Sequence, residues 1–273
     1  MADYEQIIYS QEGRVVTLTL NRPERLNAWT GVMETEFIDA VNRVAADDSA
    51  GCIVITGAGR GFCAGADIGG WAQQQAGTAP VPAKVHAPAL AQTIAQRASP
   101  NVPLTLAAGK PVIAAINGPA IGIGLTMALG CDIRIASDKA RFSARFVRVG
   151  LTPECGGTYN LPQIAGIETA LILALTGRII EATDPLAAKL VSRIVPAEEL
   201  LPAAYALAYE IASGPTDPVW LTKRLIRRNA AEQSLQTVVA NETQLFHQVQ
   251  DKADHREAVA AFMEKRQPSF HEA

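Results

Sequence analysis

The hydrophobic and polar positions in the first half of the chain predict short strands that alternate with helices. Extended Ile7–Tyr9, a turn and the β-branched segment Val15–Leu20 predict a hairpin. Short apolar runs predict buried strands at Cys52–Thr56 and Val112–Ile116, and Ile133–Ala136 is predicted to form a third strand. A further extended segment is expected at Phe142–Val149. This part of the chain is therefore predicted to form an α/β core.

Helical periodicity dominates the rest of the chain. Met33, Phe37 and Val41 are four residues apart, which places them on one face of a helix that begins near residue 30. From Gly156 onward most of the chain is predicted to be helical. The predicted helices include 123–129, 198–212, 218–232, 235–250 and 255–265. An α/β core with a helical C-terminal part follows, and the boundary is expected within 180–215.

Composition narrows the class of protein. The chain has 273 residues, of which 48% are hydrophobic, and a formal net charge of −3. That length suits one large α/β domain or one domain with a small appendage, and the apolar content excludes intrinsic disorder. The near-neutral balance, without a long basic run, argues against nucleic acid as a partner. A local basic cluster remains compatible with an anionic ligand.

The spacing of the cysteines and the character of the N-terminal residues predict a protein of a reducing compartment. Cysteines at 52, 63, 131 and 155 form no CxxC pair and have no histidine at ligand spacing, so neither a metal centre nor a disulfide framework is predicted. The acidic N-terminus lacks the regions of a signal peptide. No charge lies between Lys110 and Asp132, but Asn117-Gly118-Pro119 interrupts this stretch, so a strand, a turn and a helix are expected there. We therefore expect a cytoplasmic protein that does not enter membranes.

Common nucleotide-binding and hydrolase motifs are missing from the sequence. Gly57 and Gly59 follow a predicted strand, but Phe62 stands where a dinucleotide-binding turn would have its third glycine. There is no GxxxxGK[ST] and no GxSxG. The four histidines lie outside the glycine-rich segments. The chemistry is therefore expected from backbone groups and carboxylates, with a nicotinamide oxidoreductase as an outside alternative.

Two glycine-rich turns, 62–67 and 117–124, each follow a predicted buried strand. Such turns can point unpaired N–H groups into a cavity, and the N-terminus of the helix after the second turn adds positive potential. Two donors from separate turns that meet at one oxygen would form an oxyanion hole. The alternative is that the glycines only let helices pack closely against strands.

Several ordered segments resemble the crotonase family, which comprises the enoyl-CoA hydratases and isomerases. The likeness is carried by NRPERLNA at 21–28, TGAGRGFCAGAD at 56–67 and KPVIAAINGPA at 110–120, and it extends over about residues 5–270. The resemblance implies a crotonase-like spiral of ββα units at 1–195 and a helical trimerisation region at 196–273. It also implies an acyl-CoA substrate, assembly as a homotrimer or a dimer of trimers, and no cofactor or metal beyond the coenzyme A of the substrate.

By position, the resemblance assigns the oxyanion hole to the backbone N–H groups of Ala66 and Ile123. The family usually has glycine where Ile123 stands, so the donor is kept but the side chain is expected to narrow the pocket. Arg25 is expected to contact a CoA phosphate, unless it is only a solvated surface charge. The positions implied to bind the CoA and acyl parts are Arg25, Leu26, Ala28, Ala64, Asp67, Ile68, Gly122, Thr126 and Phe146.

Departures from the family pattern bear on the reaction. Hydratases of this family use two glutamates, and Thr126 and Phe146 stand at those positions. Neither can act as a base near neutral pH, so ordinary hydration is not expected. Glu154 remains as the only acid, and it resembles the acid of members that shift double bonds, including the ring-opening isomerase of phenylacetate breakdown. The resemblance implies a one-base proton shuttle, with a weak hydratase and a non-catalytic acyl-CoA-binding protein as alternatives.

The surroundings of Glu154 leave its ionisation open. A helix that begins near Gly156 favours the carboxylate, whereas an apolar acyl pocket raises the pKa. Glu154 could instead cap that helix or pair with an arginine. The nearby Arg141, Arg145 and Arg148 are expected to be solvated or paired with acids at a subunit interface, and contact of Arg145 or Arg148 with Glu154 is the alternative.

Two further features bear on the acyl pocket. Trp29 and Trp71 could line it, although packing in the core is the simpler interpretation. The Ala-, Gln- and Pro-rich segment 73–103 is expected to form a loop or irregular helices that shape the pocket.

Overall fold

The main sheet of the computed structural model, which describes residues 4–69 and 101–271, has six strands in the order β1-β2-β3-β4-β6-β9. Strands β1 and β2 form an antiparallel hairpin, and the remaining neighbours are parallel. The strands are β1 (Ile7–Glu12), β2 (Val15–Leu20), β3 (Cys52–Gly57), β4 (Val112–Ile116), β6 (Ile133–Ser137) and β9 (Arg193–Val195). Strands β1 and β2 confirm the predicted hairpin, and β3, β4 and β6 confirm the three further strands that the sequence predicts.

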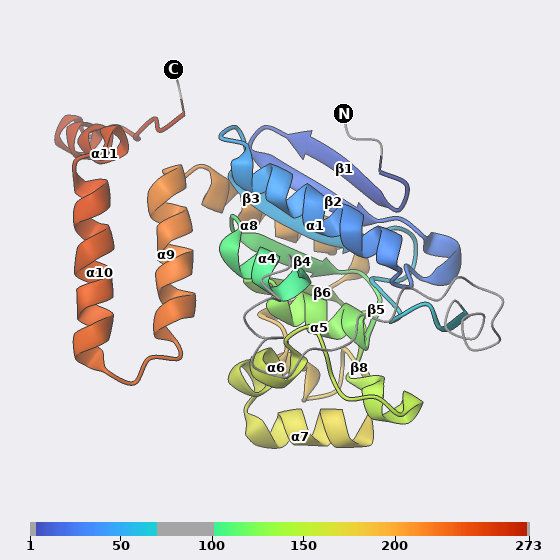
Figure 1. The fold of residues 1–273 in the computed structure, drawn as a ribbon. Coiled ribbons are helices and arrows are strands. Elements are labelled where there is room, and N and C mark those ends of the chain that lie inside the picture. The colour runs from blue at the N-terminus through green and yellow to red at the C-terminus, as the bar shows by residue number, and fades with distance from the viewer. Residues whose placement is uncertain (1–3, 70–100, 272–273) are drawn as a thin grey trace.

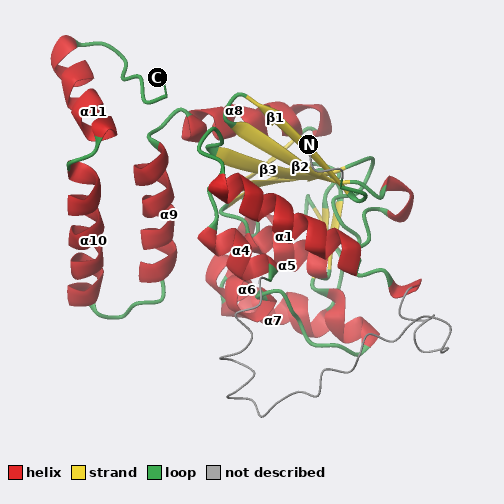
Figure 2. Ribbon diagram, turned by 45° about the horizontal axis from the view of Figure 1, so that its top comes forward, coloured by secondary structure: helices red, strands yellow, loops and turns green. Residues whose placement is uncertain are grey.

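Both faces of the sheet are covered by helices (Figures 1 and 2). Along β3, Ile53 and Ile55 face one apolar core, and Cys52 and Val54 face another, as the alternation of side chains in a strand requires. The first core includes α1 (Gly31–Ala46), α4 (Val102–Ala108) and α5 (Ile123–Gly130), and α8 (Leu200–Ala212) packs on the other face. Burial on both faces explains why a central strand such as β3 is apolar along almost its whole length.

Helix α1 carries part of the site described below, and its start is fixed by Thr30. The Thr30 side-chain oxygen accepts a hydrogen bond of 3.1 Å from the Met33 N–H, as is usual for an N-cap. Met33, Phe37, Val41 and Val44 are buried, which confirms the predicted apolar face.

A second, smaller sheet lies beside the main one and contains β5 (Pro119–Ile121), β7 (Arg141–Ser143) and β8 (Ile180–Glu181). Helices α6 (Gly157–Ala165) and α7 (Ile167–Thr176) pack against each other next to it.

The prediction of an extended segment over Phe142–Val149 is wrong beyond Ser143. Residues Arg145–Val149 form a 3-10 helix. Gly150 ends it in the left-handed conformation, with its N–H directed to the carbonyls of Phe146 and Val147. Arg145 and Arg148 therefore do not continue the strand that carries Arg141.

The last three helices are α9 (Thr216–Asn229), α10 (Leu235–Gln250) and α11 (Ala253–Glu264), and they stand to one side of the core (Figure 1). They confirm the helices predicted from residue 218 onward. The domain boundary after residue 195 remains a prediction; α8, which follows that boundary, packs on β3 and β4.

Helix α4 begins near the end of the segment 73–103, which is expected to shape the acyl pocket. Trp71 and residues 73–100 lie outside the described residues, so the predictions made for them are not addressed. Asn101 caps α4, because its Oδ1 accepts a hydrogen bond of 3.1 Å from the Leu104 N–H. No described helix has the length and apolarity needed to cross a bilayer.

Candidate active site

The two glycine-rich turns are bonded to each other. Cys63 N–H donates to the Pro119 carbonyl, and Ile121 N–H donates to the Cys63 carbonyl, both at 2.9 Å. Gly124 permits this approach, because a Cβ there would lie 2.2 Å from the Cys63 carbonyl oxygen. The close packing of the two turns thus requires glycine at position 124, and the same packing brings the ends of the turns together.

Ala66 and Ile123 present N–H groups without a backbone acceptor among the described residues. Beside Ala66, the hydrogen bonds to the adjacent segment are donated by Trp29 N–H to Gly65 O and by Asp67 N–H to Trp29 O, at 2.8 and 2.9 Å. Ile123 is the first residue of α5, a position whose N–H has no partner within the helix. Both donors are therefore free for a ligand oxygen, and the dipole of α5 supports negative charge there.

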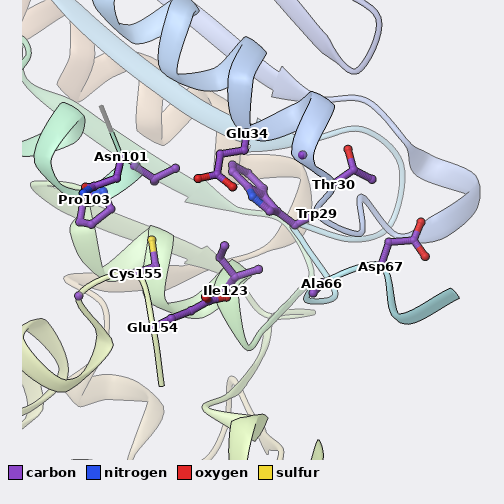
Figure 3. A pocket seen from close by; sticks show the side chains of 13 residues that line it. Trp29, Thr30, Glu34, Ala66, Asp67, Asn101, Pro103, Ile123, Glu154 and Cys155 are labelled. Carbon is purple, nitrogen blue, oxygen red and sulfur yellow. The ribbon is translucent and has the colours of Figure 1, made fainter. Parts of the chain in front are cut away.

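Two cavities meet at these donors, one of about 710 Å³ and one of about 230 Å³. Ala66, Ile123 and Glu154 line both of them. In Figure 3, Ile123 and Glu154 lie on one side of the larger cavity, opposite Trp29 and Glu34. The three residues with predicted catalytic roles thus come from three separate segments and surround the junction between the cavities.

The cavities differ in chemistry. The smaller cavity is mostly apolar, with Ile68, Ile121, Phe146, Val149 and Leu151 in its wall. The larger one carries the polar side chains of Thr30, Glu34, Asp67 and Asn101 as well as Glu154. A ligand that occupies both would therefore have an apolar and a polar part.

Glu154 lies just before the start of α6, in a turn where Cys155 and Gly156 both have positive φ, 52° and 71°. Burial raises the pKa of the Glu154 carboxyl, and the negative charge of Glu34 raises it further. The rise in pKa is in the direction that the sequence led us to expect from an apolar pocket. Burial also raises the pKa of the adjacent Cys155 thiol to about 12, so that sulfur is neutral near physiological pH and is no nucleophile there.

The expectation of a single acid at the site is wrong. Glu34, in the first turn of α1, also lines the larger cavity. Sequence reasoning compared only the glycine turns and the segments after them, whereas Glu34 reaches the cavity from a helix 120 positions away from Glu154. The one local hint was its place in the first turn of an amphipathic helix, four residues after the Thr30 N-cap and next to buried Met33.

The residues predicted to bind CoA and the acyl group are distributed unevenly. Ala64, Ile68, Gly122 and Phe146 line the smaller cavity, and Asp67 lines the larger one. Arg22 bonds to Asp67 at 2.9 Å, and this hydrogen bond lowers the pKa of the Asp67 carboxyl.

Four predicted binding residues lie outside both cavities. Arg25 is exposed on a short 3-10 turn, and Leu26 and Ala28 follow it in a loop whose Leu26 carbonyl accepts from the Ala64 N–H at 3.0 Å. That loop is thus attached to the edge of the smaller cavity. Thr126 is buried within α5, donates to the Ile123 carbonyl at 3.3 Å, and lines a separate cavity of about 140 Å³.

The three arginines have different surroundings. Arg141 pairs with Glu181 of the same chain at 2.9 Å, and Arg148 donates to the Thr176 carbonyl at 2.6 Å. Arg145 lines the smaller cavity together with Glu154. Trp29 both packs against Phe37 and lines the larger cavity, so the two interpretations offered for it hold together.

The raised pKa of Glu154 gives a prediction for the pH dependence of catalysis. A base must be ionised, so activity should fall on the acid side through a pKa above that of an ordinary glutamate. Glu34→Gln removes a neighbouring negative charge, which lowers the pKa of Glu154 and moves the acid limb of kcat/KM to lower pH. Glu168→Gln, in the exposed first turn of α7, is the matched control and should leave the limb in place. An acid limb that stays fixed or moves upward in Glu34→Gln would refute this coupling.

Comparison with known proteins identifies the family. The profile of the enoyl-CoA hydratase/isomerase family matches residues 10–273. The chain is 39% identical to a 1,2-epoxyphenylacetyl-CoA isomerase of Escherichia coli, over 97% of this chain and 98% of the relative. It is 37% identical to a probable enoyl-CoA hydratase of Dictyostelium discoideum, over 96% of this chain and 89% of the relative.

Solved structures agree with this match. A probable enoyl-CoA hydratase/isomerase from Mycobacterium abscessus superposes with a TM-score of 0.81 at 35% identity, covering 98% of this chain and 99% of the other. An enoyl-CoA hydratase from Bacillus anthracis gives 0.83 at 29% identity, with 97% and 99% covered. These matches show an enzyme of the hydratase/isomerase type that acts on CoA thioesters. The chain belongs to the enoyl-CoA hydratase/isomerase family and has the crotonase fold.

Proposed function

We propose that this enzyme moves a carbon–carbon double bond in an acyl-CoA by a one-base proton shuttle. The observation that carries the proposal is that, within the described part of the chain, only Ala66, Ile123 and Glu154 line both cavities. A thioester oxygen bound to the two N–H groups would have its acyl carbons next to the Glu154 carboxylate. Further support comes from sequence similarity. This chain is 39% identical to an Escherichia coli protein that is named as an isomerase, 1,2-epoxyphenylacetyl-CoA isomerase.

The reaction would proceed in two proton transfers. The Glu154 carboxylate removes a proton from C2 of a 3-enoyl thioester, and the C–H electron pair forms a C2–C1 double bond as the carbonyl electrons move to oxygen. The resulting dienolate oxygen accepts from the N–H groups of Ala66 and Ile123. Protonated Glu154 then returns the proton to C4, the carbonyl re-forms, and the double bond lies between C2 and C3. Proton and charge are both restored, so no external acid is consumed.

The residues at the two positions where the family's hydratases have glutamates favour isomerisation over hydration. Phe146, which stands where the family's hydratases have a glutamate, forms part of an apolar wall. The other such position, Thr126, is directed at carbonyls of its own helix. Neither position offers a base or a site for an attacking water.

One observation supports a second candidate function. Hydration needs a group that activates water and a group that protonates C2, and Glu34 and Glu154 are two carboxylates in one cavity. A hydratase that uses this pair is therefore the alternative. Initial rates with a 3-enoyl-CoA and with crotonyl-CoA separate the two: the proposal predicts rapid conversion of the first and slow hydration of the second. Fast hydration that Glu34→Gln abolishes would establish the alternative instead.

We also propose that the enzyme is a cytoplasmic homotrimer or dimer of trimers assembled through α9–α11. These helices expose large apolar side chains, namely Ile226, Leu235, Phe246, Phe262 and Met263, and Phe262 is 81% exposed. Contiguous exposed apolar side chains of this kind mark association surfaces. The proposal needs no metal and no cofactor beyond the CoA of the substrate.

The assembly proposal predicts a change in solution mass. The native chain should elute with light-scattering mass near three or six times its 28.9 kDa. Phe262→Asp should shift the population to monomers, because a carboxylate buried at an interface without a partner is strongly unfavourable. Ile8→Asp, at an exposed apolar site on the hairpin, is the control and should keep the native mass. A monomeric native chain, or an unchanged mass in Phe262→Asp, would oppose the proposal.

A further inference from the structure

Several polar side chains of the larger cavity already have partners within the chain. The side-chain oxygens of Thr30 and Asn101 cap α1 and α4. Asp67 is paired with Arg22, and Figure 3 shows its carboxylate on the far side of the cavity from Glu154. These groups serve the fold and have little need of a ligand.

Trp29 is different. Its Nε1 is buried and has no hydrogen-bond partner, and among the described residues no other buried side-chain nitrogen or oxygen is in that state. The residue is 5% exposed, it lines the larger cavity, and its ring packs edge-on against Phe37 at a centroid distance of 5.5 Å. Packing thus fixes the indole in place. A buried donor without an acceptor is costly and rare in native proteins, which points to an acceptor supplied from outside the chain.

Glu34 lines the same cavity as Trp29 and has no cation partner among the described residues. Its carboxylate, on a half-buried residue, makes no hydrogen bond or ion pair with the described side chains. In Figure 3, Glu34 and Trp29 both lie across the cavity from Glu154. Glu154 is used for proton transfer under the proposed function, so Trp29 and Glu34 form a donor and an acceptor that no step employs.

We propose that Trp29 and Glu34 form a subsite for a hydroxyl group on the acyl part of the substrate. This inference rests on the proposed function and adds that the acyl group extends from the thioester site into the larger cavity. The ligand hydroxyl oxygen accepts from the Trp29 Nε1–H, and its O–H donates to the Glu34 carboxylate. The substrate is then a hydroxylated acyl-CoA.

The chemistry of the pair selects a hydroxyl over other groups. A ketone or ether oxygen satisfies the indole N–H but directs its lone pairs at the Glu34 carboxylate. A ligand carboxylate would be repelled by Glu34 and Glu154. An ammonium group satisfies Glu34 but has no acceptor for the indole. A hydroxyl both accepts and donates, so it meets both needs at once.

The subsite is tested by the binding of matched saturated or aromatic thioesters that cannot isomerise. Two sets serve as probes: phenylacetyl-CoA with its three ring-hydroxylated isomers, and hexanoyl-CoA with 6-hydroxyhexanoyl-CoA. Calorimetric Kd values are measured for the native enzyme, Trp29→Phe, Glu34→Leu and the control Glu168→Gln. Trp29→Phe keeps an aromatic ring beside Phe37 but removes the five-membered ring of the indole together with its N–H. We expect at least one hydroxylated ligand to bind about tenfold or more tightly than its parent, as is typical of a hydrogen bond to a charged acceptor.

That preference should fall to threefold or less in Trp29→Phe and in Glu34→Leu, and it should persist in Glu168→Gln. Equal binding of hydroxylated and parent ligands by the native enzyme would overturn the inference, since water alone would then satisfy the pair. A preference that survives both substitutions would overturn it as well. The outcome is independent of turnover: if Glu154→Gln proves fully active but the hydroxyl preference holds, the proposed function fails and the subsite stands.

Discussion

Replacement of Glu154 by Gln is expected to lower kcat for 3-enoyl-CoA isomerisation by about 10³-fold, the range of a well-placed general base. The amide keeps the size of the side chain and its place at the junction of the two cavities, but it cannot take a proton from C2. Because the acyl group and CoA make their other contacts unchanged, KM should vary by less than about threefold.

Glu168→Gln is the control for this substitution, since it removes an equivalent exposed charge far from the cavities. Circular dichroism and thermal unfolding should show the native fold in both variants. A Glu154→Gln enzyme with native kcat would remove this residue from the mechanism. A large rise in KM with an unchanged kcat would assign it to binding only.

Removal of one oxyanion donor is the second change with a large expected effect. Ile123→Pro deletes the N–H at the first position of α5. Proline is tolerated there, because its fixed φ suits the first helical turn and no intrahelical bond is lost. The preceding Gly122, with φ 56° and ψ −121°, is outside the α region that a following proline disfavours. We expect kcat to fall about 10²–10³-fold, the usual loss for one oxyanion-hole donor.

Ile123→Val is the matched control, because it keeps the N–H and changes the side chain by one methylene. Its kcat should stay within about threefold of native, since only transition-state charge stabilisation depends on the donor. Equal losses in Ile123→Pro and Ile123→Val would show that the side chain matters and the N–H does not. Native activity in Ile123→Pro would exclude Ile123 from the oxyanion hole.

The backbone donors and Glu154 were assigned by position from the resemblance to the crotonase family, and the local sequence is consistent with the turns that hold them. The apolar strands before each turn, the glycines that allow Cys63 and Ala120 to approach, and the start of α5 at Ile123 are all local features. Cys155 and Gly156 likewise turn the chain directly before α6.

The residues that escaped prediction depend on contacts between distant segments. Glu34 reaches the cavity because α1 packs on the same face of the sheet as α5. Its neighbours in the sequence indicate the start of an amphipathic helix, but not that this end of the helix lines a cavity together with Glu154. The 3-10 helix after β7 was missed because its valines, Val147 and Val149, are β-branched and generally favour strands. The segment instead ends at Gly150, which has the left-handed conformation.

The central claim is that one carboxylate removes and returns the same proton. Its most direct test is a single turnover of a 3-enoyl-CoA deuterated at C2, carried out in ordinary water with the native enzyme and with Glu34→Gln. We predict that deuterium appears at C4 of the product and that Glu34→Gln still completes the turnover. Solvent hydrogen alone at C4, together with loss of turnover in Glu34→Gln, would mean that a second acid delivers the proton and would contradict the one-base account.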